Sequence, residues 1–216
     1  MVLDKTRERA DPLLNLIAKR FTVFSPDFLS WCALLFSLMA GIFFYFSSPA
    51  TELQNFFLFF AAIFVLLNGL FDAIDGKVAH LTNKASARGD FIDHVLDRYA
   101  DVFMVGALAL SPWCRSPIGL LAIIGVLLTS YMGTQAQAIG YKRDYSGLLG
   151  RADRLVLLMI FPILQHIALS SAVQFPWDIT IIELVLGYFA VVGNITAIQR
   201  FYLTLRWFRG DVKKGK

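Results

Sequence analysis

Six long apolar segments constrain this fold more than any other feature of the sequence. They lie near residues 27–47, 53–79, 88–111, 117–140, 150–170 and 179–206. A helix needs about 20 residues to cross the hydrocarbon core of a bilayer, and each segment is long enough. The chain is 57% hydrophobic and only 17% charged, which excludes an ordinary soluble domain of this length. The sequence therefore predicts an all-α integral membrane protein with six transmembrane helices.

The segment before the first span predicts a different kind of helix. Leu14, Ile17 and Phe21 recur at helical spacing, as in an amphipathic helix that lies on a membrane surface. The chain as a whole then forms one membrane domain. Its expected parts are an interfacial juxtamembrane helix (1–25), a six-helix bundle (26–206) and a cytoplasmic tail (207–216).

The positive charges indicate how the chain is oriented. Eighteen lysines and arginines flank the apolar segments on the side of the two termini, whereas the three loops on the opposite side hold only Arg115. By the positive-inside rule, both termini face the cytoplasm, and the protein is expected in the cell membrane. The cations lie at the edges of apolar runs rather than in one patch, which argues against nucleic acid as a partner.

Four aspartates lie where the second and third spans approach the cytoplasmic side. Asp72 and Asp75 are three residues apart, and Asp93 and Asp97 are four apart, so each pair lies on one helical face. A carboxylate in hydrocarbon costs about 2.5–3.5 kcal/mol, and like charges repel one another. Oxygen ligands suit Mg²⁺ or Mn²⁺, so binding of two such ions is the simplest compensation. The alternative is that the acids are solvated and pair with neighbouring cations.

Small residues lie beside these aspartates. Gly76 directly follows the first pair, Ala79 comes one turn later, and Gly89 lies four residues before the second pair. Because glycine lets a backbone approach a bulky ligand closely, the pattern predicts a nucleotide slot beside the metal site. His94 is offset by one residue from the second pair, so we expect it to point away from the metals and do not count it as a ligand.

The stretch from Asp72 to Asp97 resembles the signature of the CDP-alcohol phosphatidyltransferase family, D-x2-D-G-x2-A-R-x8-G-x3-D-x3-D. Seven of the eight fixed residues match at the family's spacing: Asp72, Asp75, Gly76, Ala79, Gly89, Asp93 and Asp97. The eighth is His80, where the family usually has arginine. Asp27 and Ser30 in "SPDFLSW" resemble the family's Pro-Asn-x-x-Thr start of the first span. The resemblance implies six transmembrane helices, a juxtamembrane helix, a cytosol-facing site and a homodimer.

The resemblance also implies a role for each matching residue. The metal ligands would be Asp72, Asp75, Asp93 and Asp97, and Asp97 would also act as the catalytic base. The residues that bind the cytidine diphosphate of a CDP-linked lipid would be Gly76, Ala79, His80, Gly89 and Ser30. Because histidine lacks the permanent charge of arginine, nucleotide binding would be weaker or would depend on pH.

The acceptor is predicted from a basic set. Arg151 and Arg154 lie one turn apart in "GRADR" and, with Arg200, suit a phosphorylated acceptor. These positions resemble the archaeal members of the family's inositol-phosphate-accepting branch. This implies transfer of an archaetidyl group to inositol 1-phosphate, with release of CMP, in phospholipid biosynthesis. Glycerol phosphate and serine are alternatives, because cytoplasmic loops are basic in any case and the run "GTQAQA" is uncharged.

A function of a different class is also open at this point. Acidic residues within spans often mark ion pathways, so a divalent-cation or proton-coupled transporter is an alternative. Against it, the acids cluster at one end of their helices, and the sequence shows no inverted repeat or pair of broken helices. A hydrolase that uses the same metals is a third alternative.

Overall fold

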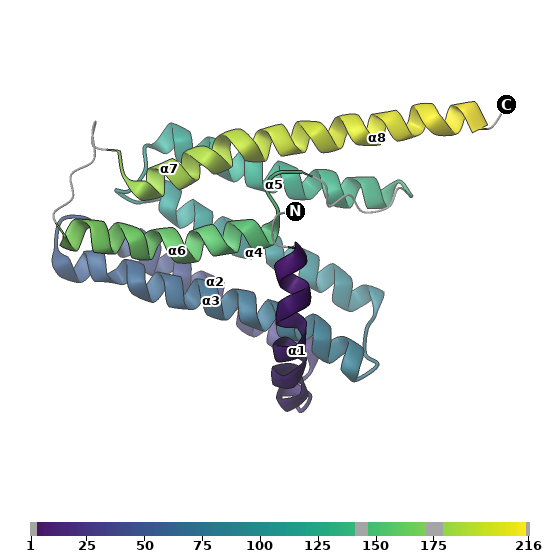
Figure 1. Ribbon diagram of the computed structural model, residues 1–216, viewed down its shortest axis with the longest axis horizontal. Coiled ribbons are helices and arrows are strands. Elements are labelled where there is room, and N and C mark those ends of the chain that lie inside the picture. The colour runs from purple at the N-terminus through teal and green to yellow at the C-terminus, as the bar shows by residue number, and fades with distance from the viewer. Residues whose placement is uncertain (1–3, 141–146, 172–178, 215–216) are drawn as a thin grey trace.

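The computed structural model describes residues 4–140, 147–171 and 179–214. Within these ranges the chain consists of helices and the turns between them, with no strand (Figure 1). The elements are α1 (Asp4–Phe21), α2 (Pro26–Phe46), α3 (Glu52–Leu81), α4 (Ala87–Leu110), α5 (Ser116–Ala138), α6 (Arg151–Ser170), α7 (Ile181–Tyr188), a π-helix (Phe189–Gly193) and α8 (Asn194–Lys214).

Five stretches of helix among the described residues are long and apolar enough to cross a membrane. They are α2, α3, α5, α6 and the continuous helix Ile181–Phe208. The sixth expected span corresponds to α4, which has 24 residues but four charged side chains among its last 18. α4 packs against α2 and α5 and buries Asp97 and Asp101. Five of the six expected spans are therefore supported by length and composition, and α4 is less apolar because it carries acidic side chains into the bundle.

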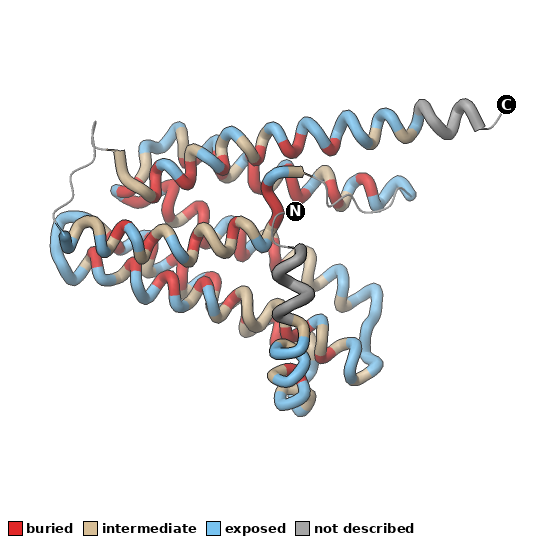
Figure 2. The backbone as a smooth tube through the Cα atoms, in the orientation of Figure 1, coloured by how far each residue is buried: buried red, intermediate tan, exposed pale blue. Residues whose placement is uncertain are grey.

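A continuous apolar core joins the helices. Its fully buried members include Phe44 of α2, Val65 of α3, Met104 of α4 and Phe189 of the π-helix. Figure 2 shows buried residues where neighbouring helices face one another and exposed residues around the outside. Many of the exposed side chains are large and apolar, among them Leu53 and Leu110, as expected for a surface that contacts lipid rather than water.

The α4–α5 loop is tied to two helices by polar contacts. Nε of Arg115 lies 2.7 Å from Oε1 of Glu183 in α7, and its Nη2 donates to Oε2 at 3.1 Å. Nε1 of Trp113 donates to Oγ of Ser47 at 2.7 Å. Arg115, the one cation in the three loops on the side opposite the termini, therefore has a structural role: it fixes the start of α5.

α1 runs across the direction of the other long helices and packs on α3 (Figure 1). A small apolar cluster joins it to α2 and α3: Ala18, Leu29, Ile74 and Val78, with Ile17 and Phe21 packed against them. Nζ of Lys77 donates to Oδ1 of Asp11 at 2.9 Å. Of the predicted apolar face, Leu14, Ile17 and Phe21 are all half-buried. α1 is thus fixed across the end of α3 that carries the aspartates.

The π-helix brings the last long helix into close contact with α5. Oγ1 of Thr129 donates to the carbonyl oxygen of Gly193 at 2.7 Å. A Cβ atom added at Gly193 would lie 2.9 Å from the carbonyl carbon of Gly125, and one added at Gly125 would lie 2.9 Å from the carbonyl oxygen of Phe189. Glycine at both positions therefore allows two backbones to touch. The extra residue in the π turn also changes which side chains of α8 face α5.

We expect Gly125→Ala to destabilise the protein by about 1–3 kcal/mol, because the added methyl group meets backbone atoms that cannot rotate away. Thermal unfolding in detergent, followed by circular dichroism, measures the change. Gly187→Ala is the matched control, since a Cβ atom there meets nothing within 4 Å. Equal melting temperatures for the two variants would contradict the proposed backbone contact.

Candidate active site

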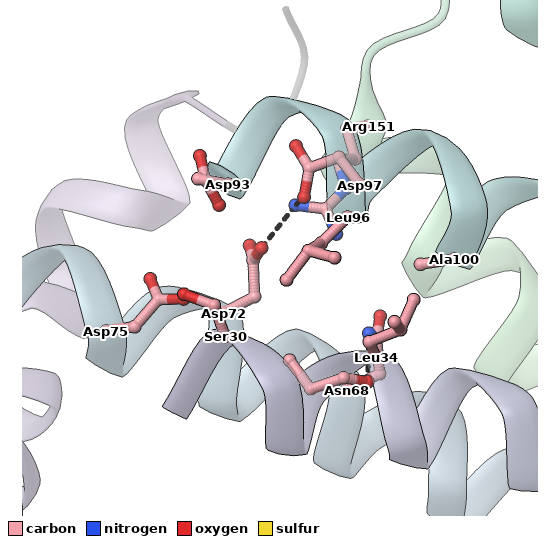
Figure 3. Close-up of a pocket in the computed structure, with 11 residues that line it drawn as sticks. Ser30, Leu34, Asn68, Asp72, Asp75, Asp93, Leu96, Asp97, Ala100 and Arg151 are labelled. Carbon is pink, nitrogen blue, oxygen red and sulfur yellow. Dashed lines mark hydrogen bonds and ion pairs between the residues drawn. The ribbon is translucent and has the colours of Figure 1, made fainter. Parts of the chain in front are cut away.

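The turn between α3 and α4 determines where the four aspartates lie. Asn83 has a φ of 55°, a left-handed conformation that asparagine adopts more readily than most residues. Ser86 caps α4, and its Oγ accepts a hydrogen bond from the backbone N–H of Gly89 at 3.1 Å. The chain reverses direction between Leu81 and Ala87, so the last turns of α3 face the first turns of α4 across a pocket (Figure 3).

The pocket is small and strongly acidic. Its lining comes from α2, α3, α4 and α6: Ser30, Ala33, Leu34, Asn68, Asp72, Asp75, Asp93, Leu96, Asp97, Ala100 and Arg151. Its volume is about 10 Å³, which is about enough for one water molecule. Asp75 and Asp97 are buried, and Asp72 and Asp93 are half-buried. The structure therefore brings the four predicted aspartates together in one place.

Arg151 supplies the positive charge of this pocket. Its Nη1 lies 2.5 Å from Oδ1 of Asp72 and 2.6 Å from Oδ1 of Asp97, so one nitrogen bridges the two helices (Figure 3). The first turn of α6 is fixed by Asp153, whose Oδ2 accepts a hydrogen bond from the backbone N–H of Gly150 at 3.0 Å. Sequence reasoning predicted Arg151 as a ligand for the acceptor phosphate and did not anticipate this pairing with the aspartates.

Ser30 also contacts the acidic cluster directly. Its Oγ donates to Oδ2 of Asp75 at 2.5 Å, and both side chains are buried. One turn along the same wall, Nδ2 of Asn68 donates to the carbonyl oxygen of Ala33 at 2.9 Å and holds α3 against α2. The residue predicted from its position at the start of the first span is thus a hydrogen-bond partner of a predicted metal ligand.

A second set of ion pairs lies behind the pocket. Asp101, one turn beyond Asp97 on α4, lies 3.2 Å from Nη1 of Arg154 and 3.8 Å from Nε of Arg98. Arg98 in turn reaches Oδ2 of Asp97 at 3.4 Å. Acidic and basic side chains therefore alternate from the pocket into the bundle, and Asp97, Asp101 and Arg154 each have a neighbour of opposite sign.

Two of the three arginines predicted for the acceptor converge on α5. Nη1 of Arg154 donates to the carbonyl oxygen of Val126 at 3.2 Å, and Nη1 of Arg200 donates to that of Thr129 at 2.6 Å. Both arginines are buried. Arg151 precedes Arg154 by one turn of α6 and faces the aspartates instead. The basic set is therefore adjacent to the acidic pocket but divided between two groups of partners.

Of the positions predicted to bind the nucleotide, Ser30 lines the pocket, and the other four lie on α3 and α4 outside its lining. A Cβ atom added at Gly76 would meet no atom within 4 Å. His80, one turn later on α3, is exposed, and Ala79 is half-buried. Gly89 lies in the first turn of α4 and is half-buried. Space beside Gly76 is consistent with a bulky ligand there, and the nucleotide-binding roles stay predictions.

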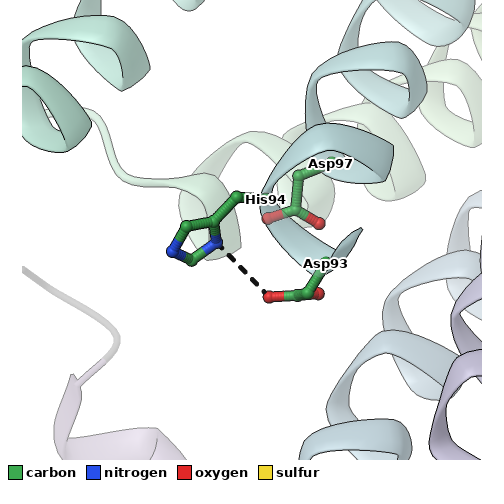
Figure 4. Close-up of side chains that lie close together, drawn as sticks. All are labelled: Asp93, His94 and Asp97. Carbon is green, nitrogen blue, oxygen red and sulfur yellow. Dashed lines mark ion pairs between the residues drawn. The ribbon is translucent and has the colours of Figure 1, made fainter. Parts of the chain in front are cut away.

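His94 lies closer to the aspartates than its position on the helix suggested. Its Nδ1 is 3.5 Å from Oδ2 of Asp93 (Figure 4). Asp93, His94 and Asp97 each offer one ligand atom, and these atoms lie within 4.8 Å of one another. The expectation that a one-residue offset turns His94 away from the metal cluster was wrong, because a long side chain at the edge of a helical face can bend toward it.

The donor atoms of the pocket suit a divalent cation. Among the lining residues, four carboxylates face one guanidinium, which leaves an excess of negative charge. Carboxylate oxygens are typical ligands for Mg²⁺ and Mn²⁺. The residues present therefore fit a metal site.

Known proteins resemble this chain in sequence and in fold. Residues 23–196 match the family model described as CDP-alcohol phosphatidyltransferase. Archaetidylinositol phosphate synthase of Pyrococcus horikoshii is 28% identical over 93% of this chain and 95% of the relative. The fold resembles Mycobacterium tuberculosis phosphatidylinositol phosphate synthase with CDP-DAG bound, with a TM-score of 0.69 and 20% identity over 89% of this chain and 94% of that one. The same enzyme in complex with manganese and citrate gives a TM-score of 0.68 and 21% identity over 89% of this chain and 88% of that one.

We expect Arg151→Gln to destabilise the metal-free protein by about 3–5 kcal/mol, because it removes the partner of two carboxylates that are largely shielded from solvent. Unfolding in detergent with EDTA measures this loss. Added Mn²⁺ should restore much of it, since a divalent ion replaces the missing charge.

Arg88→Gln is the matched control for that experiment. Arg88 also pairs with an aspartate, Asp27, at 3.2 Å, but its side chain is 78% exposed whereas that of Arg151 is 19% exposed. Its loss should cost less than about 1 kcal/mol. Similar losses in both variants would show that Arg151 does not act as a buried counter-charge.

Proposed function

We propose a specific reaction for this chain, which belongs to the CDP-alcohol phosphatidyltransferase family and is therefore a membrane-bound transferase. A phosphatidyl-type group, which we take to be archaetidyl, passes from a CDP-linked lipid to the hydroxyl group of inositol 1-phosphate, and CMP is released. The similarity to an archaetidylinositol phosphate synthase along nearly the whole chain supports this choice of lipid and acceptor.

The observation that carries the proposal is the convergence of four carboxylates from two helices in one pocket. Asp72, Asp75, Asp93 and Asp97 would hold two divalent ions, Mg²⁺ or Mn²⁺. When bound, such ions neutralise the oxygens of the diphosphate and so favour attack by a nucleophile. The family membership and the position of the pocket at one end of α3 and α4 favour this transferase over a transporter.

Asp97 is the proposed base. It lies one turn from Asp93 on the pocket wall, and its Oδ1 is held 2.6 Å from Arg151. Asp97 accepts the hydroxyl proton as the acceptor oxygen attacks the lipid-side phosphorus, and the bond from that phosphorus to the CMP oxygen breaks. General-base help of this kind is typically worth about 10²–10⁴-fold in rate.

The two substrates would approach from different sides of the pocket. The proposed contacts of the cytidine diphosphate are Gly76, Ala79, His80, Gly89 and Ser30. The lipid chains stay in the bilayer, since only the head group has to reach the acids. The acceptor phosphate would bind to Arg154 and Arg200 near α5, with Arg151 between them and the carboxylates.

We place the site and both termini on the cytoplasmic side of the membrane. The distribution of lysines and arginines along the chain supports this orientation. α1, which crosses the direction of the bundle, would then lie along the cytoplasmic surface (Figure 1). A homodimer is the proposed assembly, on the resemblance to the family.

An acceptor screen with purified protein tests the proposed reaction. With one CDP-linked lipid and Mg²⁺, we expect CMP release with inositol 1-phosphate to exceed that with glycerol 3-phosphate or serine, and EDTA to abolish it. Arg154→Gln should raise KM for inositol 1-phosphate more than KM for the lipid. CMP release with water as the only acceptor would indicate a hydrolase, and metal flux into vesicles without CMP would indicate a transporter.

Asp97→Asn should lower kcat by about 10²–10⁴-fold, because the amide cannot accept the proton. Calorimetric titration with Mn²⁺ should show that metal binding is largely kept. Asp11→Asn is the control: Asp11 pairs with Lys77 outside the pocket, so this variant should keep its activity. If Asp97→Asn loses metal binding together with activity, the assignment of Asp97 as the base fails.

A further inference from the structure

We propose that His94 is a metal ligand and that it gives the site a preference for later transition ions that accept nitrogen, such as Co²⁺, over Mg²⁺. This inference rests on the proposed function, because it concerns the same metal centre. It adds a residue that is not one of the eight fixed positions of the D-x2-D-G-x2-A-R-x8-G-x3-D-x3-D signature.

The geometry places one nitrogen of His94 toward the acids. Nδ1 lies 3.5 Å from Oδ2 of Asp93, and ligand atoms from Asp93, His94 and Asp97 lie within 4.8 Å of one another. An ion held between the two carboxylates would therefore also be within reach of the imidazole. Figure 4 shows the three side chains on α4, with the dashed contact between His94 and Asp93.

The other nitrogen of His94 faces a carboxylate outside the pocket. Nε2 lies 3.4 Å from Oδ1 of Asp90, which is one turn earlier on α4. A histidine that binds a metal commonly presents its second nitrogen to a carboxylate, which holds the ring in place and leaves a lone pair on the nitrogen that faces the ion. The side chain of His94 is only 16% exposed whereas that of Asp90 is 58% exposed, so the pair runs from the site to the surface.

This arrangement predicts which metal ions bind more tightly because of His94. Carboxylates alone suit Mg²⁺, which prefers oxygen, whereas an imidazole nitrogen strengthens binding of later transition ions. Removing the imidazole should therefore weaken Co²⁺ binding most and change Mg²⁺ binding little. Asp90 would act as a positioning residue, because it contacts His94 and is not one of the three residues whose ligand atoms lie together.

Metal titrations of the full chain in detergent, with no lipid or acceptor, test the proposal. We expect His94→Gln to lower the affinity for Co²⁺ about 10-fold or more, and Asp90→Asn to lower it less while His94 still binds. The affinity for Mg²⁺ should stay nearly constant in both variants. Pulsed electron paramagnetic resonance with Mn²⁺ should show coupling to an imidazole nitrogen in the wild type and lose it in His94→Gln.

The chain has three histidines, so the source of any nitrogen coupling can be assigned. His166→Gln is the matched control, because His166 lies in α6 with its ring against Phe56, away from the pocket. Nitrogen coupling that persists in His94→Gln, or a Co²⁺ to Mg²⁺ affinity ratio that does not change, overturns the proposal and leaves the proposed function intact. If no divalent ion binds and transfer proceeds in EDTA, both the metal-dependent function and the role of His94 are wrong.

Discussion

The concentration of negative charge inside an apolar bundle is the constraint on which the rest of this structure depends. Four carboxylates share a pocket of about 10 Å³, and among the residues that line it Arg151 is the one cation. Uncompensated charges of this kind are costly in a membrane protein, so nearby residues are arranged to offset them. Arg151 bridges Asp72 and Asp97, and Ser30 donates to Asp75. A divalent ion would complete this compensation and would give the pocket its chemistry.

The helices around the pocket form two groups that arginines connect. α2, α3, α4 and α6 supply the pocket lining, whereas α5 packs against the π-helix and α8. Arg154 on α6 and Arg200 on α8 both donate to carbonyl oxygens of α5, at Val126 and Thr129. The close approach at Gly125 and Gly193 fixes α8 against α5 and so determines where Arg200 lies. The proposed acceptor site therefore depends on packing in the bundle core as well as on its own side chains.

Much of the site could be predicted from spacing along single helices. The pairs Asp72 with Asp75 and Asp93 with Asp97 follow from the helical period, and all four carboxylates do line one pocket. Arg151 could not be assigned in the same way, because its partners come from α3 and α4 while it starts α6. His94 was misjudged because an offset on a helical wheel describes where a Cβ atom points. Rotation about the side-chain bonds of His94 lets its ring lie between Asp90 and Asp93.

The sequence by itself determined that the chain is helical and embedded in a membrane, because lengths of apolar residues and the cost of exposed backbone in lipid leave few alternatives. It also determined which acids share a helical face, since that depends only on the helical period. The tertiary structure decided which helices face one another across the pocket, that Arg151 is the counter-charge of the acids, and that His94 lies beside them. These features depend on distances between helices, which are set by packing between residues far apart in the sequence, such as the backbone contact of Gly125 with Gly193.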